Sequence, residues 1–148
     1  LTAYSQGRQI VIAKVDVPSG MGFSVRVGSE LDVLVSASGR VLLAFQDAET
    51  RRLRVGESSA RETGQDVTGL TATLDKIAER GFEASPSGQV RGLFAISYPI
   101  LDLRSHALAA LTVPYADRID RADRSSLEEV EAILASAAQQ LTSRIVGN

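Results

Sequence analysis

Residues 36–45 read SASGRVLLAF, a run of small residues followed by bulky apolar ones. Ser36 is a favourable N-cap residue, so the stretch predicts a helix that begins directly after it. Two explanations for the small residues are open. Gly39 allows another backbone to approach closely, or the short side chains leave the first N–H groups of the helix accessible to a small anion. From spacing alone the first explanation is the stronger, because every helix start has free amide groups.

Upstream of this helix the sequence predicts β-structure. A short first strand ends at a Gln6-Gly7 hairpin turn, and the branched residues of RQIVIAKVDV (8–17) predict a second strand. After a break, GFSVRVG (22–28) alternates apolar and polar residues and places Phe23 on the apolar face. We therefore expect a third strand over residues 22–28.

Downstream the pattern becomes helical. Asp47 is a candidate cap for a short helix over residues 48–54, and the polar segment 56–69 predicts a surface loop. A third helix follows from residue 70, with Gly81 as its C-terminal stop.

Two apolar segments, GLFAISYPI (92–100) and ALAALTVPY (107–115), predict a hairpin with both faces covered. The last segment predicts a long amphipathic helix, for which Ser125 and Glu128 form a candidate capping box. The apolar stripe of this helix consists of Leu127, Val130, Leu134, Ala137, Leu141 and Ile145. This order of elements predicts one α+β domain over residues 1–148, an antiparallel sheet with helices on both faces.

Composition narrows the function classes. Hydrophobic residues make up 44% of the chain, enough for a folded core, and the absence of cysteine excludes thiol chemistry and disulfides. With a net charge of −2, the chain lacks the excess of basic residues that is typical of a nucleic-acid-binding domain. No apolar run reaches the ~18 residues that a membrane span requires. With one histidine and no cysteine, we expect no metal site and no cofactor. The missing initiator methionine and the absence of a signal-peptide pattern predict a fragment of a longer cytoplasmic protein.

The sequence holds no recognisable catalytic constellation. His106 is the only imidazole, and no G-x-S-x-G elbow supplies a nucleophile for it. An enzyme is therefore the least favoured function. The remaining candidate is a small-molecule pocket with apolar strand walls, in which Ser36, Ser38 and Thr112 offer hydroxyl groups. Free amides near Ser38 and Gly39 would bind a carboxylate.

Several segments carry a family resemblance. VGSELDVLVSASGRVLLAF (27–45) is similar to a glycine-led loop that enters a helix of the form small-x-G-K-A-L-L-A. TLDKIAERGFEAS (73–85) is similar to a helix that ends in Gly-Tyr, and GLFAISYPILD (92–102) is similar to a Gly-Val-x-x-Ile-Ala-x-Pro strand. ALAALTV (107–113) matches the strand that follows. In this order the motifs resemble the effector-binding domain of IclR-type bacterial transcription regulators, over nearly the whole chain.

The resemblance implies a GAF-like sandwich and, N-terminal to this chain, a winged helix-turn-helix and a linker helix. DNA binding would belong to that part, and the sensor domain would contribute to a homodimer or homotetramer. The effector would bind between the sheet and the helix that begins with small residues. The candidate site then comprises an apolar wall of Phe23, Leu31 and Leu93, the helix start at Ser36, Ala37, Ser38 and Gly39, and the family's polar positions at Ser85, Ala95, Thr112 and Pro114.

The chain departs from the family pattern at several positions. Two polar pocket positions are Ala95 and Pro114, which offer no side-chain hydrogen bond, and the family's acidic pair falls on Ser87 and Gly88. Because an unpaired buried polar group costs about 1–3 kcal/mol, we expect an aromatic or longer-chain organic acid rather than a short keto acid. A structural oligomerisation module without a ligand is the alternative, and a filled core in place of a cavity would favour it.

Overall fold

The computed structural model describes residues 1–16, 24–62, 64–88, 90–116 and 125–147. Within these ranges the chain forms an antiparallel six-stranded sheet and four α-helices. In chain order the elements are β1 (Thr2–Ser5), β2 (Arg8–Val11), β3 (Glu30–Leu31), α1 (Ala37–Ala44), α2 (Ala48–Arg61), α3 (Leu70–Arg80), β4 (Glu83–Pro86), β5 (Leu93–Leu101), β6 (Ala107–Ala116) and α4 (Leu127–Val146).

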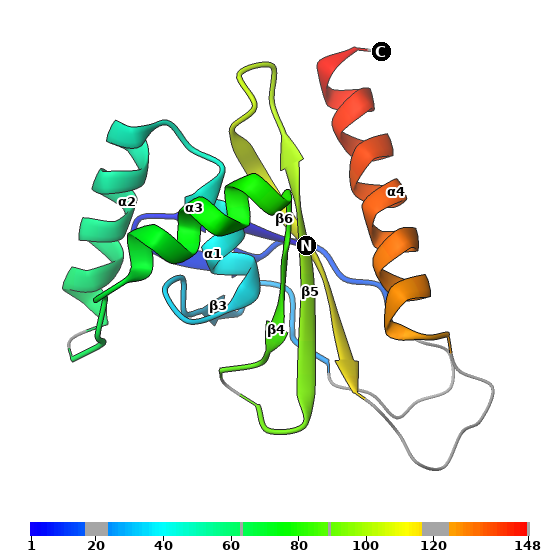
Figure 1. Ribbon diagram of the computed structural model, residues 1–148, viewed down its shortest axis with the longest axis horizontal. Coiled ribbons are helices and arrows are strands. Elements are labelled where there is room, and N and C mark those ends of the chain that lie inside the picture. The colour runs from blue at the N-terminus through cyan, green and yellow to red at the C-terminus, as the bar shows by residue number, and fades with distance from the viewer. Residues whose placement is uncertain (17–23, 63, 89, 117–124, 148) are drawn as a thin grey trace.

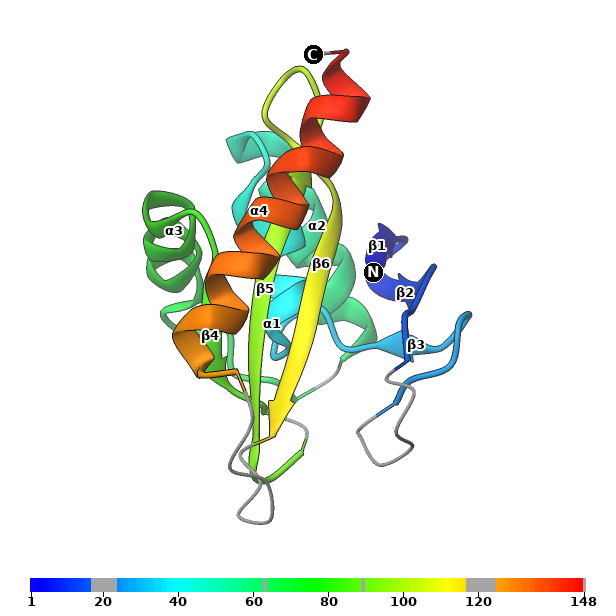
Figure 2. The same cartoon turned by 90° about the vertical axis from the view of Figure 1, so that its right-hand side faces the viewer.

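The sheet has the strand order β3-β2-β1-β6-β5-β4 and separates two helical layers. Helix α1 contacts β1, β4, β5 and β6, and α2 and α3 pack against α1, while α4 contacts β5 and β6 from the opposite face (Figures 1 and 2). The α+β sandwich with helices on both faces, expected from the order of the elements, is confirmed.

Helix α1 is the centre of the core. Val41, Leu42 and Leu43 are each 0% exposed, because the sheet covers one side of the helix and α3 the other. A Cβ atom on Gly39 would lie 2.2 Å from the carbonyl oxygen of Val33, a contact that no side chain can make. The first explanation for Gly39 is therefore confirmed: the loop before α1 crosses the helix at backbone distance.

The two predicted hairpins are present, but the predicted second strand over residues 8–17 is too long: β2 ends at Val11, and residues 12–16 are not part of a strand. Gln6 and Gly7 both have positive φ angles, +47° and +82°, as a tight turn between two short strands requires. Strands β5 and β6 pair along their length, with Ser97 opposite Thr112.

The predicted third strand over residues 22–28 is wrong within its described part, residues 24–28. The segment that pairs with β2 lies further along the chain, at Glu30–Leu31. Gly28 adopts a φ of +88°, and its N–H group donates to the carbonyl oxygen of Val11. The turn at Gly28 places the pairing residues after it and leaves Val27 56% exposed.

The predicted loop over residues 56–69 is wrong for its first part, because α2 continues to Arg61. Tertiary packing extends the helix. Ser58 is fully buried, and a Cβ atom on Gly7 would lie 2.7 Å from the carbonyl oxygen of Glu57. The first hairpin therefore packs directly on the second half of α2.

Strand β4 was not expected from the sequence. It lies at the edge of the sheet, where Pro86 can close a strand without losing a ladder hydrogen bond.

The capping box of α4 is shifted by one residue from the prediction. Ser126 is the N-cap, its side chain accepts from the N–H group of Glu129, and Glu129 accepts from the N–H group of Ser126. The packed face of the helix is also displaced, since Leu134 and Ala138 are buried whereas Leu141 and Ile145 are 37% and 51% exposed.

Candidate functional site

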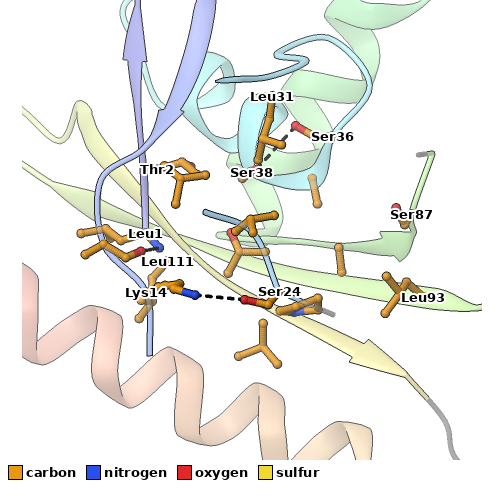
Figure 3. Close-up of a pocket in the computed structure, with 18 of the residues that line it drawn as sticks. Leu1, Thr2, Lys14, Ser24, Leu31, Ser36, Ser38, Ser87, Leu93 and Leu111 are labelled. Carbon is orange, nitrogen blue, oxygen red and sulfur yellow. Dashed lines mark hydrogen bonds between the residues drawn. The ribbon is translucent and has the colours of Figure 1, made fainter. Parts of the chain in front are cut away.

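A cavity of about 460 Å³ lies where β1 and β6 separate (Figure 3). These two strands share one registered pair, Thr2 opposite Ala110. The residues of β6 that follow this pair, Leu111 to Pro114, line the cavity. The start of α1 closes a second side, and Leu134 and Leu141 of α4 reach the cavity from the other face of the sheet.

Most of the residues expected at the site line this cavity. They are Leu31, Ser36, Ala37, Ser38, Leu93, Ala95, Thr112 and Pro114. Gly39 and Ser85 do not line it: Gly39 packs against Val33, and Ser85 pairs with Ala95 along the β4–β5 ladder. Phe23 lies outside the described residues.

Ser36 holds the start of α1 in place. Its hydroxyl donates to the carbonyl oxygen of Asp32 at 2.5 Å and accepts from the N–H group of Gly39 at 3.0 Å. The side-chain amide of Gln9, a fully buried residue of β2, donates to the same hydroxyl and to the Asp32 carbonyl. The hydroxyl of Ser36 is thus fully used within the protein, so Ser36 positions the site.

Two amides of the first turn of α1 are available. The N–H groups of Ala37 and Ser38 precede the first intrahelical bond, and no described residue accepts from them. The N–H group of Gly39, expected to be free, is bonded by the Ser36 cap. The Ser38 hydroxyl makes only a 3.5 Å contact with the Ser36 hydroxyl. The positive end of the α1 dipole adds to these donors, so this end of the cavity favours an anion.

The strand wall of the cavity contains two different hydroxyl groups. Thr112 lies 2.9 Å from the hydroxyl of Ser97, so these two groups satisfy each other. Thr2 is 5% exposed, and its hydroxyl oxygen is buried without a hydrogen-bond partner among the described residues.

A further polar cluster lines the cavity away from α1. The ammonium group of Lys14 lies 2.8 Å from Oδ2 of Asp16 and donates to the Ser24 hydroxyl at 3.1 Å. Ser24 in turn donates to Oδ1 of Asp16 at 3.1 Å. The bonds from Lys14 and Ser24 hold the pKa of the Asp16 carboxyl below its usual range. Sequence reasoning missed this cluster, because no strand or helix pattern brings residues 14–16 and 24 together.

The lone histidine is remote from the cavity lining. Nε2 of His106 lies 3.6 Å from Oδ2 of Asp47, and the imidazole is partly buried rather than free in solvent. The described residues contain no group of three or more acidic or histidine side chains able to hold a metal ion. In the same part of the chain, no helix has both the length and the apolar character to cross a bilayer.

Two arginines of α2 have structural roles. Arg51 donates to the carbonyl oxygen of Ala44 at 2.6 Å, and Arg54 donates to that of Leu42 at 3.1 Å. They satisfy carbonyl groups at the C-terminal end of α1 that have no partner within the helix.

Fold and cavity together define an α+β domain with a largely apolar cavity between its sheet and its central helix. The family model of the C-terminal domain of bacterial IclR transcriptional regulators matches residues 1–143. The chain therefore belongs to this family, which comprises transcriptional regulators rather than enzymes.

Individual relatives agree with this assignment. The regulator KdgR of Escherichia coli is 26% identical over 98% of this chain and 56% of its own length. The chain thus spans about half the length of the curated relatives it matches. The crystal structure of Pseudomonas aeruginosa HmgR has a TM-score of 0.80 at 24% identity, covering 97% of this chain and 57% of that one. An IclR homologue of Microbacterium hydrocarbonoxydans, solved in complex with 4-hydroxybenzoate, has a TM-score of 0.75 at 20% identity, covering 97% and 58%. These structural likenesses establish the shared fold.

Proposed function

We propose that the chain is the effector-binding domain of an IclR-type regulator and that a small organic acid binds in the cavity beside α1. The observation that carries this proposal is the first turn of α1, where Ala37 and Ser38 line the largely apolar cavity and their amides have no acceptor among the described residues. A carboxylate at this position would accept both hydrogen bonds and interact favourably with the helix dipole.

The size and lining of the cavity favour an aromatic or longer-chain acid. About 460 Å³ is within the roughly 300–1,000 Å³ of small-molecule sites. Ala95 and Pro114 offer no side-chain hydrogen bond, and Leu31, Leu93 and Leu111 add apolar wall. The bound 4-hydroxybenzoate of the Microbacterium homologue supports the same ligand class.

The regulatory role rests on parts outside this chain. We propose that a winged helix-turn-helix and a linker helix precede it, that DNA is bound there, and that the regulator works in the cytoplasm as a homodimer or homotetramer. The effector would act by binding one arrangement of the assembly more tightly and so shifting its population. The family assignment supports this role.

The alternative, an oligomerisation module without a ligand, calls for a filled core at this position. The 460 Å³ cavity favours sensing instead.

A thermal-shift series on the purified chain distinguishes effector sensing from an oligomerisation module without a ligand. Benzoate, 4-hydroxybenzoate, hexanoate and octanoate are each compared with the corresponding primary amide. A saturable rise in melting temperature with acids but not with amides is expected, because a ligand that binds only the folded state stabilises it. A flat response to every acid from a folded sample would overturn the sensing function and favour the alternative.

A further inference from the structure

The cavity has a second polar end. Lys14, Asp16 and Ser24 all line it, and Figure 3 shows Lys14 and Ser24 directed toward each other, well separated from Ser36 and Ser38. Among the described lining residues, Lys14 is the only lysine, arginine or histidine. Apolar residues of β2, β3 and β6 lie along the wall of the cavity: Val11, Leu31, Leu111 and Val113. A ligand that spans the cavity would therefore meet polar groups at both ends and apolar walls between them.

The hydrogen-bonding capacity of this cluster is only partly used. The Lys14 ammonium has three N–H donors, of which one bonds Asp16 and one bonds Ser24. No described residue takes the third, and the side chains of Lys14 and Asp16 are 35% and 57% exposed, so solvent bonds the open positions until a ligand displaces it. The Asp16 carboxylate has further lone pairs beyond those that receive Lys14 and Ser24. Because each of the three side chains is bonded to the other two, one free donor and one free acceptor are held close together.

A hydroxyl group fits this combination. It accepts a hydrogen bond from Lys14 and donates one to Asp16, so both free positions are used. A second carboxylate fits less well, because it would share Lys14 with Asp16 at the cost of like-charge repulsion.

We propose that Lys14, held by Asp16 and Ser24, is a specificity-determining residue that selects organic acids carrying a hydroxyl group at the end remote from the carboxylate. This inference rests on the proposed function, because the carboxylate must be bound at the start of α1. The middle of the effector is then an aromatic ring or a methylene chain that packs on the apolar walls.

Calorimetric titration of matched ligands tests the proposal. The probes are benzoate with 4-hydroxybenzoate, and hexanoate with 6-hydroxyhexanoate and adipate, so that two lengths and three end groups are compared. We expect at least one hydroxy acid to bind about tenfold more tightly than its parent acid. This is the increase in affinity that one additional charge-assisted hydrogen bond provides. Adipate should show no such gain over hexanoate.

Variants assign the gain to Lys14. In Lys14→Met the hydroxy acid and its parent should bind within about twofold of each other, because the hydrogen bond that distinguishes them is removed and the apolar wall is kept. Ser24→Ala removes the hydrogen bond between Lys14 and the Ser24 hydroxyl. It should therefore reduce, but not abolish, the affinity difference between the hydroxy acid and its parent acid. The matched control is Arg8→Met on β2, which breaks an exposed ion pair with Glu30 of β3 but does not touch the cavity. Arg8→Met should bind the hydroxy acid more tightly than the parent acid by the same factor as the unmodified chain.

The outcomes separate this inference from the proposed function. If the acids bind but hydroxy acids gain nothing, or if the gain survives in Lys14→Met, the role of Lys14 is overturned and the acid-binding function stands. If adipate binds best, Lys14 selects a second carboxylate and the proposal is equally overturned. If no acid binds to a folded chain, the proposed function fails and this inference falls with it.

Discussion

Because the hydroxyl of Thr2 has no hydrogen-bond partner among the described residues, its removal should stabilise the protein, whereas most substitutions destabilise one. Thr2 is 5% exposed, and its Oγ1 atom has no hydrogen-bond partner among the described residues. A buried, unpaired polar group destabilises a protein by about 1–3 kcal/mol. Thr2→Val replaces this hydroxyl with a methyl group of similar size on a strand, where valine is well tolerated. We therefore expect Thr2→Val to raise the free energy of unfolding by about 1–2 kcal/mol.

Thr112→Val is the matched control, since it makes the same chemical change on the same cavity wall. The Thr112 hydroxyl lies 2.9 Å from that of Ser97, which is fully buried. Its removal leaves Ser97 unpaired, so Thr112→Val should lower the free energy of unfolding by about 1–2 kcal/mol.

Urea denaturation of the two variants and the parent chain measures both effects. Thermal unfolding of the same proteins is a second measurement: for a chain of this length, 1 kcal/mol corresponds to a change of roughly 2–4 °C in melting temperature, so the melting temperatures of the two variants should differ by several degrees. A destabilised Thr2→Val would refute the assignment of an unpaired hydroxyl, and equal effects of the two substitutions would show that Ser97 and Thr112 do not depend on each other.

Three further predictions concern α1 and α2. Gly39→Ala should destabilise the chain by at least about 2 kcal/mol in urea denaturation, because the new Cβ would lie 2.2 Å from the carbonyl oxygen of Val33; a smaller effect would show that the loop can move away. Ser38→Leu should abolish acid binding in calorimetric titration with little change in melting temperature, because the leucine would fill the cavity beside the free amides; unchanged affinity would place the acid elsewhere. The Asp47 cap should make α2 sensitive to acid, since its bonds from the N–H group and hydroxyl of Thr50 hold the pKa of Asp47 below its usual range. Its contribution is present above about pH 4 and is lost as the pH falls through the lowered pKa; Asp47→Asn should flatten this part of the stability–pH curve, and an unchanged curve would exclude the cap as its source.

The sequence predicts those features that depend on neighbouring residues. The start of α1 at Ser36 and the end of α3 at Gly81 follow from local capping preferences, and the structure has both. The capping box of α4 shows the limit of such reasoning. Two overlapping Ser-x-x-Glu pairs fit the same segment, and the pair that forms begins at Ser126.

Features that depend on tertiary contacts were not predictable from the sequence. The second half of α2 is polar and contains glycine, and it is helical because Ser58 is buried and the first hairpin packs on Glu57. Likewise, the small residues of the sequence predict the start of α1 as part of the site, whereas Thr2 and Lys14 line the cavity only because the folded sheet brings them there.

Binding of the effector carboxylate by the start of α1 is tested most directly by a titration of the ¹⁵N-labelled chain with 4-hydroxybenzoate. The titration is followed through the backbone amide resonances. The resonances of the Ala37 and Ser38 amides should shift downfield and saturate together with a single dissociation constant, since both amides donate to the bound carboxylate. Gly39, whose N–H group is already bonded by Ser36, should shift much less. Saturable binding that leaves the Ala37 and Ser38 amides unchanged, or no binding by this or any other acid of the series, would contradict the claim that this helix start holds the effector.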